Sequence, residues 1–94
     1  MTAPGEPVRR RVVVHGRVQG VFYRDSARSQ AQQRGVAGWV RNVTDGTVEA
    51  VFEGRPDDVE ALVAWARQGP PHADVDHVDV HHEPVEGVTG FRVR

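Results

Sequence analysis

The hydrophobic pattern of this 94-residue chain changes period several times, and the order of those changes limits the possible folds. A valine-rich segment with strand character comes first, at Val8 to His15. Helix-forming residues follow at Phe22 to Arg34, and Gly35 supplies a C-terminal stop. Two strand-like arms then flank Asp45-Gly46, a dipeptide that allows the positive φ of a tight hairpin turn. The first half therefore predicts strand, helix, strand, strand.

The second half repeats the alternation with a better-marked helix. Pro56 suits the first helical turn, acidic residues follow it, and an apolar stripe occupies one face. That stripe consists of Val59, Leu62, Val63 and Ala66. Gly69 and two prolines end the helix. Residues 74–83, DVDHVDVHHE, then alternate as a strand with one solvated face, and the final FRVR can add a short strand.

This order predicts an α+β fold, a ferredoxin-like βαββαβ sandwich with a mixed, antiparallel-containing sheet. Both helices should cover one face, and the C-terminal strand is a short addition. We expect a single domain over residues 8–94, preceded by a flexible tail over 1–7. A right-handed crossover makes the first two strands parallel, so their C-terminal ends share one edge. That places Arg24 near Asn42.

Composition excludes several kinds of chemistry. The chain has no cysteine, which excludes disulfides, thiolate metal sites and thiol nucleophiles. All twelve basic residues are arginines, so neither a Schiff-base lysine nor a P-loop lysine is available. A net charge of −1 gives no global attraction to nucleic acid or to an anionic membrane. With no long apolar run and no signal-peptide pattern, we expect a cytoplasmic protein with no membrane partner.

The segment HGRVQGVFYR joins the first strand to the first helix through two glycines. Glycines let a backbone turn its N–H groups inward, and the helix N-terminus adds unpaired amides with partial positive charge. Arg24 lies in the first helical turn, where a cation is unfavourable unless an anion lies beside it. A phosphate would be such an anion, and the guanidinium fork fits its oxygens. From spacing alone, a tight turn with a surface arginine is an equal alternative.

HGRVQGVFYR and GWVRNVTDGTVE together resemble the two signature segments of the acylphosphatase family, and the ending GFRVR is similar to that family's C-terminus. The resemblance extends over residues 8–94. It implies that loop amides and an arginine bind the phosphate while an asparagine positions the attacking water. The implied cradle consists of Arg17, Val18, Gln19, Gly20 and Val21. Arg24 would be the phosphate clamp, and Asn42 the water-positioning residue.

The resemblance also implies the reaction, which is hydrolysis of the carboxyl–phosphate bond of a small acyl phosphate. An acyl phosphate has a good leaving group, so positioning and charge stabilisation matter more than a protein nucleophile or a metal. We therefore expect no metal and no cofactor, and a water proton that passes to the substrate's own phosphate. Inorganic phosphate should be both product and competitive inhibitor. The enzyme is expected to be a monomer without a nucleic-acid partner.

Other groups have simpler explanations. His77, Asp79 and His81 share a strand face and could chelate zinc, but we expect the solvated face of an edge strand. His15, next to the glycine loop, could contact substrate or be structural. The arginines at 9–11 are interpreted as surface or strand-edge charges and not as a nucleic-acid patch.

Two other functions compete with hydrolysis. RNA-recognition domains share the βαββαβ order, but they need stacking aromatics on the central strands. Here the predicted third strand presents Glu49 and Glu53 on that face, which would repel a phosphate backbone. The second alternative is an acylphosphatase-like domain retained for regulation or protein contact, which the fold alone cannot exclude. The presence of both Arg24 and Asn42 favours activity.

Overall fold

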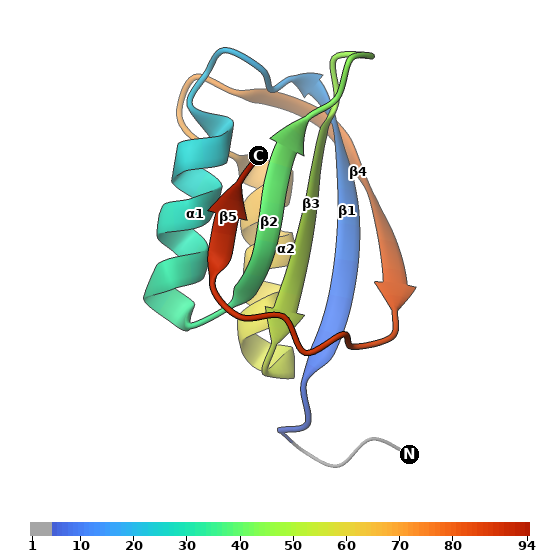
Figure 1. Ribbon diagram of the computed structural model, residues 1–94. Coiled ribbons are helices and arrows are strands. Elements are labelled where there is room, and N and C mark those ends of the chain that lie inside the picture. Colours follow the sequence, from blue (N-terminus) through green and yellow to red (C-terminus); the bar gives the residue numbers. More distant parts are fainter. Residues whose placement is uncertain (1–4) are drawn as a thin grey trace.

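A computed structural model describes residues 5–94, and within them the predicted order of elements is confirmed (Figure 1). The strands are β1 (Val8–Arg17), β2 (Ala37–Asn42), β3 (Val48–Gly54), β4 (Asp74–Glu83) and β5 (Phe91–Val93). The helices are α1 (Tyr23–Arg34) and α2 (Pro56–Gln68). Residues 1–4 of the predicted tail lie outside the described residues.

The strands form one mixed sheet in the order β4-β1-β3-β2-β5. β3 is antiparallel to both β1 and β2, so those two strands run parallel to each other, as predicted. β4 pairs antiparallel with β1, whereas β5 pairs parallel with β2. Val14 and Asn42 are both register partners of Val48. The loop after β1 and the hairpin after β2 therefore begin at the same edge of the sheet (Figure 1).

Both helices cover one face of the sheet, and the core lies between them and the strands (Figure 1). The predicted stripe of α2 is buried, and α1 buries Tyr23, Ala27 and Ala31. The sheet contributes Val12, Val14, Val40, Val48, Ala50 and Phe52. Within residues 5–94, neither helix combines the length and apolar character that crossing a membrane requires.

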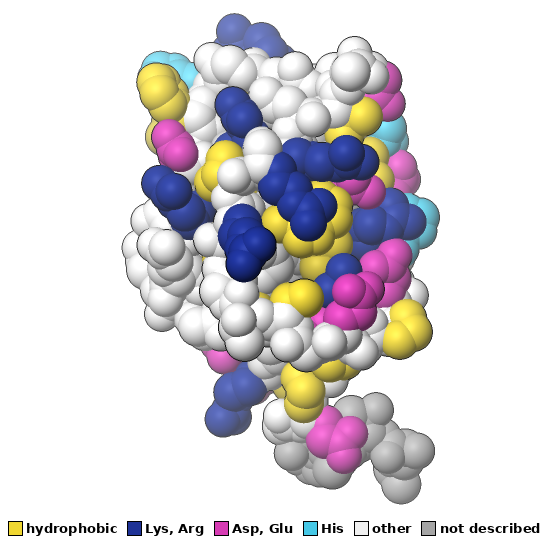
Figure 2. All heavy atoms as spheres, in the orientation of Figure 1, with side chains coloured by type: hydrophobic (Ala, Val, Ile, Leu, Met, Phe, Trp, Pro, Cys, Tyr) yellow, Lys and Arg dark blue, Asp and Glu magenta, His cyan; other side chains and the backbone are white. Residues whose placement is uncertain are grey.

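The opposite face of the sheet carries arginine and acidic side chains next to each other (Figure 2). The guanidinium of Arg11 contacts Glu83 of β4 at 2.8 Å and Glu49 of β3 at 3.4 Å. Glu49 in turn contacts Arg41 of β2 at 2.7 Å. Charges of opposite sign therefore alternate across four strands, which stabilises neighbouring strands as cross-strand pairs.

Two further charged residues on this face, Arg9 and Glu53, are buried. The sequence interpretation, which placed both at the surface, was wrong. Arg9 is only 5% exposed and Glu53 only 4%, although both were expected to be surface charges. The connection from β4 to β5 crosses this face and covers them (Figure 1). Arg9 Nη1 lies 3.3 Å from Glu53 Oε1, so each charge has a partner. The alternation of residues along a strand could not predict this burial. It indicates which face of the sheet a side chain lies on, but not whether another segment covers that face.

The carboxylate of Glu53 also fixes that connection. It accepts hydrogen bonds from the backbone amides of Glu86, Gly87 and Val88 at 2.9 to 3.0 Å. Burial alone would raise the pKa of Glu53, but these amides and the Arg9 guanidinium together lower it below its ordinary value. The ionised carboxylate is thus the form that the folded protein favours.

Candidate active site

A cavity of about 440 Å³ opens at the edge of the sheet where β1 and β2 end. It is lined by Val18, Gly20, Phe22, Tyr23, Arg24, Asp25, Asn42 and Val93. These residues come from the loop after β1, the first turn of α1, and the ends of β2 and β5. Arg24 and Asn42 therefore border the same cavity, as the parallel arrangement of β1 and β2 required.

The backbone of the loop leaves its donors free. Within the described residues 5–94, the amides of Val18, Gln19, Gly20 and Val21 donate to no protein acceptor. The loop continues into α1, whose N-terminus has no side-chain cap. Gly20 has φ 74°, a conformation that glycine adopts without strain. Free amides and an uncapped helix N-terminus together favour an anion at this place.

Gln19 ties the loop to the β2–β3 hairpin. Its side-chain amide donates to the carbonyl of Val43 at 2.7 Å and to that of Thr47 at 2.9 Å. Asp45 fixes the hairpin itself, because its carboxylate accepts the hydroxyl and the amide of Thr47. These two hydrogen bonds lower the pKa of Asp45. The loop and the strand end that carries Asn42 are thus held together.

Arg24 is half-buried, and its guanidinium donates from Nη1 to the backbone oxygen of Arg94 at 3.2 Å. That acceptor is itself well positioned. The amide of Arg94 donates to the carbonyl of Val40, and the Arg94 guanidinium lies over the ring of Trp39, 4.4 Å from its centroid. The segment after β5 therefore restrains the guanidinium of Arg24 beside the cavity.

The predicted cradle residues do not all face the cavity. Val18 and Gly20 line it, while Val21 is buried in the core. The Arg17 side chain turns away and donates to the carbonyl of His72 at 2.9 Å. It also lies 3.6 Å from the carboxylate of Asp74. Only the backbone of Arg17 is thus available to the loop, and its guanidinium braces β4 instead.

Sequence reasoning missed the apolar rim of the cavity. Phe22 is 76% exposed and has φ 64° and ψ 25°, a left-handed conformation that is strained for a bulky residue. Val93, at the end of β5, lines the same cavity. A large apolar residue between the glycine and the arginine was a possible signal for Phe22. Nothing near Val93 in the sequence marks it, because only the parallel pairing of β5 with β2 brings it here.

Tyr23 also lines the cavity, but its hydroxyl has a structural partner. It donates to the carbonyl of Ala66 in α2 at 2.8 Å. Burial raises the pKa of Tyr23 far above its ordinary value, so the phenol stays protonated. The residue therefore anchors the start of α1 to α2 and does not serve as an acid.

The three residues that the sequence offered as an alternative zinc site lie away from this cavity. His77, Asp79 and His81 lie on the exposed side of β4, which is an edge strand, as expected. They do not line the cavity. The group of possible metal ligands near them contains His15 in place of His81.

The chain is similar to known proteins over nearly its whole length. A family model described as acylphosphatase matches residues 10–93. A relative from Rubrobacter xylanophilus, named acylphosphatase, is 55% identical over 95 residues, with 100% of this chain and 86% of the relative covered. The solved structure of an acylphosphatase from Coxiella burnetii matches with a TM-score of 0.90 and 41% identity, covering 94% of this chain and 93% of that one. The acylphosphatase structure from Bacillus subtilis gives a TM-score of 0.89 at 34% identity, covering 93% and 98%. The chain belongs to the acylphosphatase family.

Proposed function

We propose that this protein hydrolyses acyl phosphates to a carboxylate and inorganic phosphate in the cavity at the ends of β1 and β2. The observation that carries the proposal is that Arg24 and Asn42 border one cavity with a loop whose amides are free. Family membership supports the reaction, and these contacts support the assignment of residues.

The phosphoryl group is assigned to the loop. The free amides of residues 18–21 and the N-terminus of α1 would bind its oxygens, and the Arg24 guanidinium would bind two of them as a fork. Negative charge on the phosphoryl oxygens would offset the unfavourable position of Arg24 in the first helical turn. These donors are fixed before substrate arrives, so little reorganisation is needed when charge develops in the transition state.

The attacking water is assigned to Asn42. Its side-chain carbonyl and amide can orient a water molecule without removing a proton. The water oxygen bonds to phosphorus, the bond from phosphorus to the acyl oxygen breaks, and the carboxylate leaves with the electron pair. The water's proton passes to an oxygen of the phosphoryl group. No protein base and no metal is required, because the carboxylate is already a good leaving group.

The acyl part of the substrate would lie at the rim formed by Phe22 and Val93. Both side chains are apolar and border the cavity next to the proposed phosphate site. Inorganic phosphate should compete with substrate, because it fits the same donors. The expected monomeric state and cytoplasmic location remain predictions.

Hydrolysis of an aromatic acyl phosphate, measured with an excess of chelator, tests this function. We expect full activity with chelator and none detectable in Arg24→Ala. Arg28→Ala is the matched control, since Arg28 lies on the same helix and, among residues 5–94, its guanidinium pairs with the exposed Asp25 at 3.7 Å and with no other carboxylate. Inactive wild-type protein, or activity that returned only with added metal, would contradict the proposal.

A further inference from the structure

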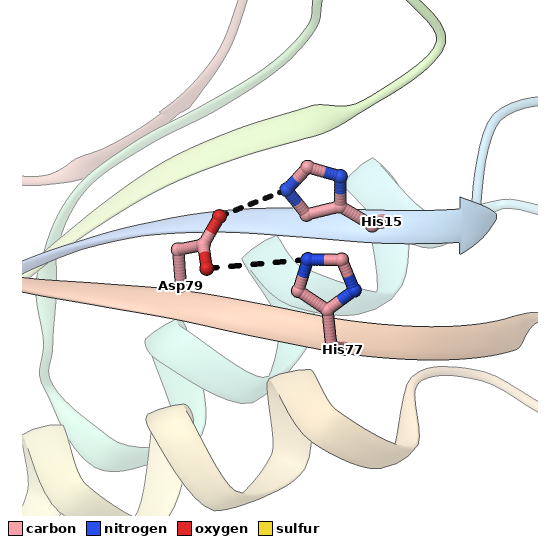
Figure 3. Close-up of side chains that lie close together, drawn as sticks. All are labelled: His15, His77 and Asp79. Carbon is pink, nitrogen blue, oxygen red and sulfur yellow. Dashed lines mark hydrogen bonds and ion pairs between the residues drawn. The ribbon is translucent and has the colours of Figure 1, made fainter.

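A second group of side chains with binding chemistry lies outside the cavity, on the face of the sheet away from the helices. It consists of His15 from β1 together with His77 and Asp79 from the edge strand β4 (Figure 3). We propose that these three residues bind a zinc ion. The site is separate from the residues assigned to hydrolysis and does not depend on that assignment.

The ligand atoms are already close together. Asp79 Oδ2 lies 2.9 Å from His15 Nε2, and Asp79 Oδ1 lies 4.0 Å from His77 Nε2 (Figure 3). One ligand atom from each residue lies within 4.8 Å of the others. In a tetrahedral zinc site with bonds of about 2.0 to 2.1 Å, ligand atoms are about 3.4 Å apart. Small side-chain movements would therefore complete the site.

The required movement is a rotation of the two rings. The imidazoles of His15 and His77 stack with centroids 4.0 Å apart and planes inclined by 13°. Their Nε2 atoms both lie on the side of Asp79, so each ring must turn about χ2 to aim at one ion, and zinc would replace the proton on each coordinating nitrogen. That torsion is broad, and both rings are at least partly open to solvent. Solvent would also supply a water as the fourth ligand.

The surrounding charges favour a cation here. Arg11, which precedes His15 on the same face of β1, is held by Glu49 and Glu83. Within residues 5–94, Asp79 contacts the two histidines and no arginine. Its negative charge is therefore left for an ion, and two imidazoles with one carboxylate are a donor set that suits zinc.

The register explains why His15 belongs to the site and His81 does not. His15 and His77 are direct partners across β1 and β4, a position in which side chains are about 5 Å apart. His77 and His81 lie four residues apart on one strand, which separates them by about 13 Å. An ion could not bridge that distance. The structure thus groups His15 with His77 and Asp79 across two strands, whereas the alternative considered from the sequence was His77, Asp79 and His81 on one strand.

Bound zinc would clamp β4 to β1. In the part of the chain that the structure describes, β4 is an edge strand whose one neighbour is β1, and the pairing shifts register just after His15. An ion held from both strands beside this irregularity would stabilise the native state by mass action.

The full-length protein, stripped of metal and transferred to a buffer that does not bind zinc, is titrated with Zn²⁺ by calorimetry. We expect one ion per chain and a rise in Tm of about 5 °C or more at tenfold excess over Kd. His77→Gln and Asp79→Asn change exposed residues and should fold normally while their zinc affinity falls about tenfold or more. His15→Gln should behave in the same way.

His81→Gln is the matched control, because it removes an exposed histidine from the same face of the same strand. It should bind zinc as the wild type does. Wild-type protein without saturable binding would overturn the proposal. A loss of affinity in His81→Gln equal to that in His77→Gln, or unchanged binding in all three site variants, would overturn it as well.

Discussion

Arg24 and Asn42 border one cavity, but their proposed roles differ at the level of single residues. Arg24 would hold the phosphoryl group in both the ground and the transition state. Asn42, at the end of β2, would hold the water and not the phosphate. Removing each side chain should therefore separate phosphate binding from turnover.

We predict that Asn42→Ala lowers kcat by about 10²-fold or more, the scale seen when one positioned polar group is lost. Inhibition by inorganic phosphate should change little in this variant. Arg24→Lys should lose both activity and phosphate binding, because a point charge on a different stem cannot replace the guanidinium fork. Phosphate inhibition constants, or calorimetry where activity is absent, give the comparison. If Asn42→Ala lost phosphate binding as Arg24→Lys does, Asn42 would belong to the cradle.

Phe22 offers a separate prediction about the acyl group. Its ring is 76% exposed at the cavity rim, so substrate binding is the event that would cover it. Phe22→Ala should raise KM for an aromatic acyl phosphate several-fold, about 1 kcal/mol for lost apolar contact, and leave KM for acetyl phosphate nearly unchanged. The ratio of the two KM values is the measurement. An equal rise for both substrates would place the effect on the loop and not on acyl recognition.

At the scale of elements, the site depends on how the loop after β1 is held against the β2–β3 hairpin. The side chain of Gln19 makes the two hydrogen bonds that join them. Because Asn42 precedes that hairpin directly, these bonds set the distance between the cradle and the proposed water.

We predict that Gln19→Met, which keeps the size and removes the donors, lowers kcat about tenfold or more. A small misplacement of a reacting group is enough for such a loss. Stability should fall by only about 1 to 2 kcal/mol, because two hydrogen bonds to backbone carbonyls are lost. Gln33→Met, an exposed glutamine on α1, is the control. Unchanged kcat in Gln19→Met, measured alongside the melting temperature, would show that the loop holds its position without this side chain.

The elements themselves were largely predictable because each has a clear period or stop signal. α2 begins at Pro56 and buries the expected stripe, and β4 covers the segment that alternated. The meeting of Arg24 and Asn42 followed from the right-handed crossover. The role of the Gln19 side chain could not be predicted, because it depends on the path of a loop that has no period.

At the scale of the whole molecule, sequence reasoning failed where one part of the chain covers another. Arg9 was expected at the surface because it follows polar alternation, yet the connection between β4 and β5 buries it beside Glu53. The same limit applies to His15, whose partners come from a strand more than 60 residues away. The β2–β3 hairpin and the parallel direction of β1 and β2 were inferable, but the pairing of β5 with β2 and the grouping of side chains from distant strands required the structure.

The buried pair of Arg9 and Glu53 gives the last prediction, which concerns stability. Glu53→Gln removes the buried carboxylate that pairs with Arg9, and leaves the Arg9 guanidinium with the more exposed Glu83 and Glu86, each at 3.3 Å. It also weakens the acceptor for three backbone amides. We expect the free energy of unfolding at pH 7 to fall by about 3 kcal/mol, the scale for breaking a buried ion pair. Glu86→Gln is the control, since Glu86 contacts Arg9 from the exposed side, and it should cost less than about 1 kcal/mol.

The pH dependence tests the same carboxylate. The folded protein lowers the pKa of Glu53, so the unfolded chain binds the proton more readily in acid. This contribution to stability is present above the unfolded pKa of about 4.3 and is lost as the pH falls through the folded pKa. Between about pH 5 and pH 3, wild-type protein should therefore lose more unfolding free energy than Glu53→Gln does. Urea denaturation of both proteins across that range measures the difference. Parallel curves would mean that the Glu53 carboxylate is not the group through which acid destabilises this fold.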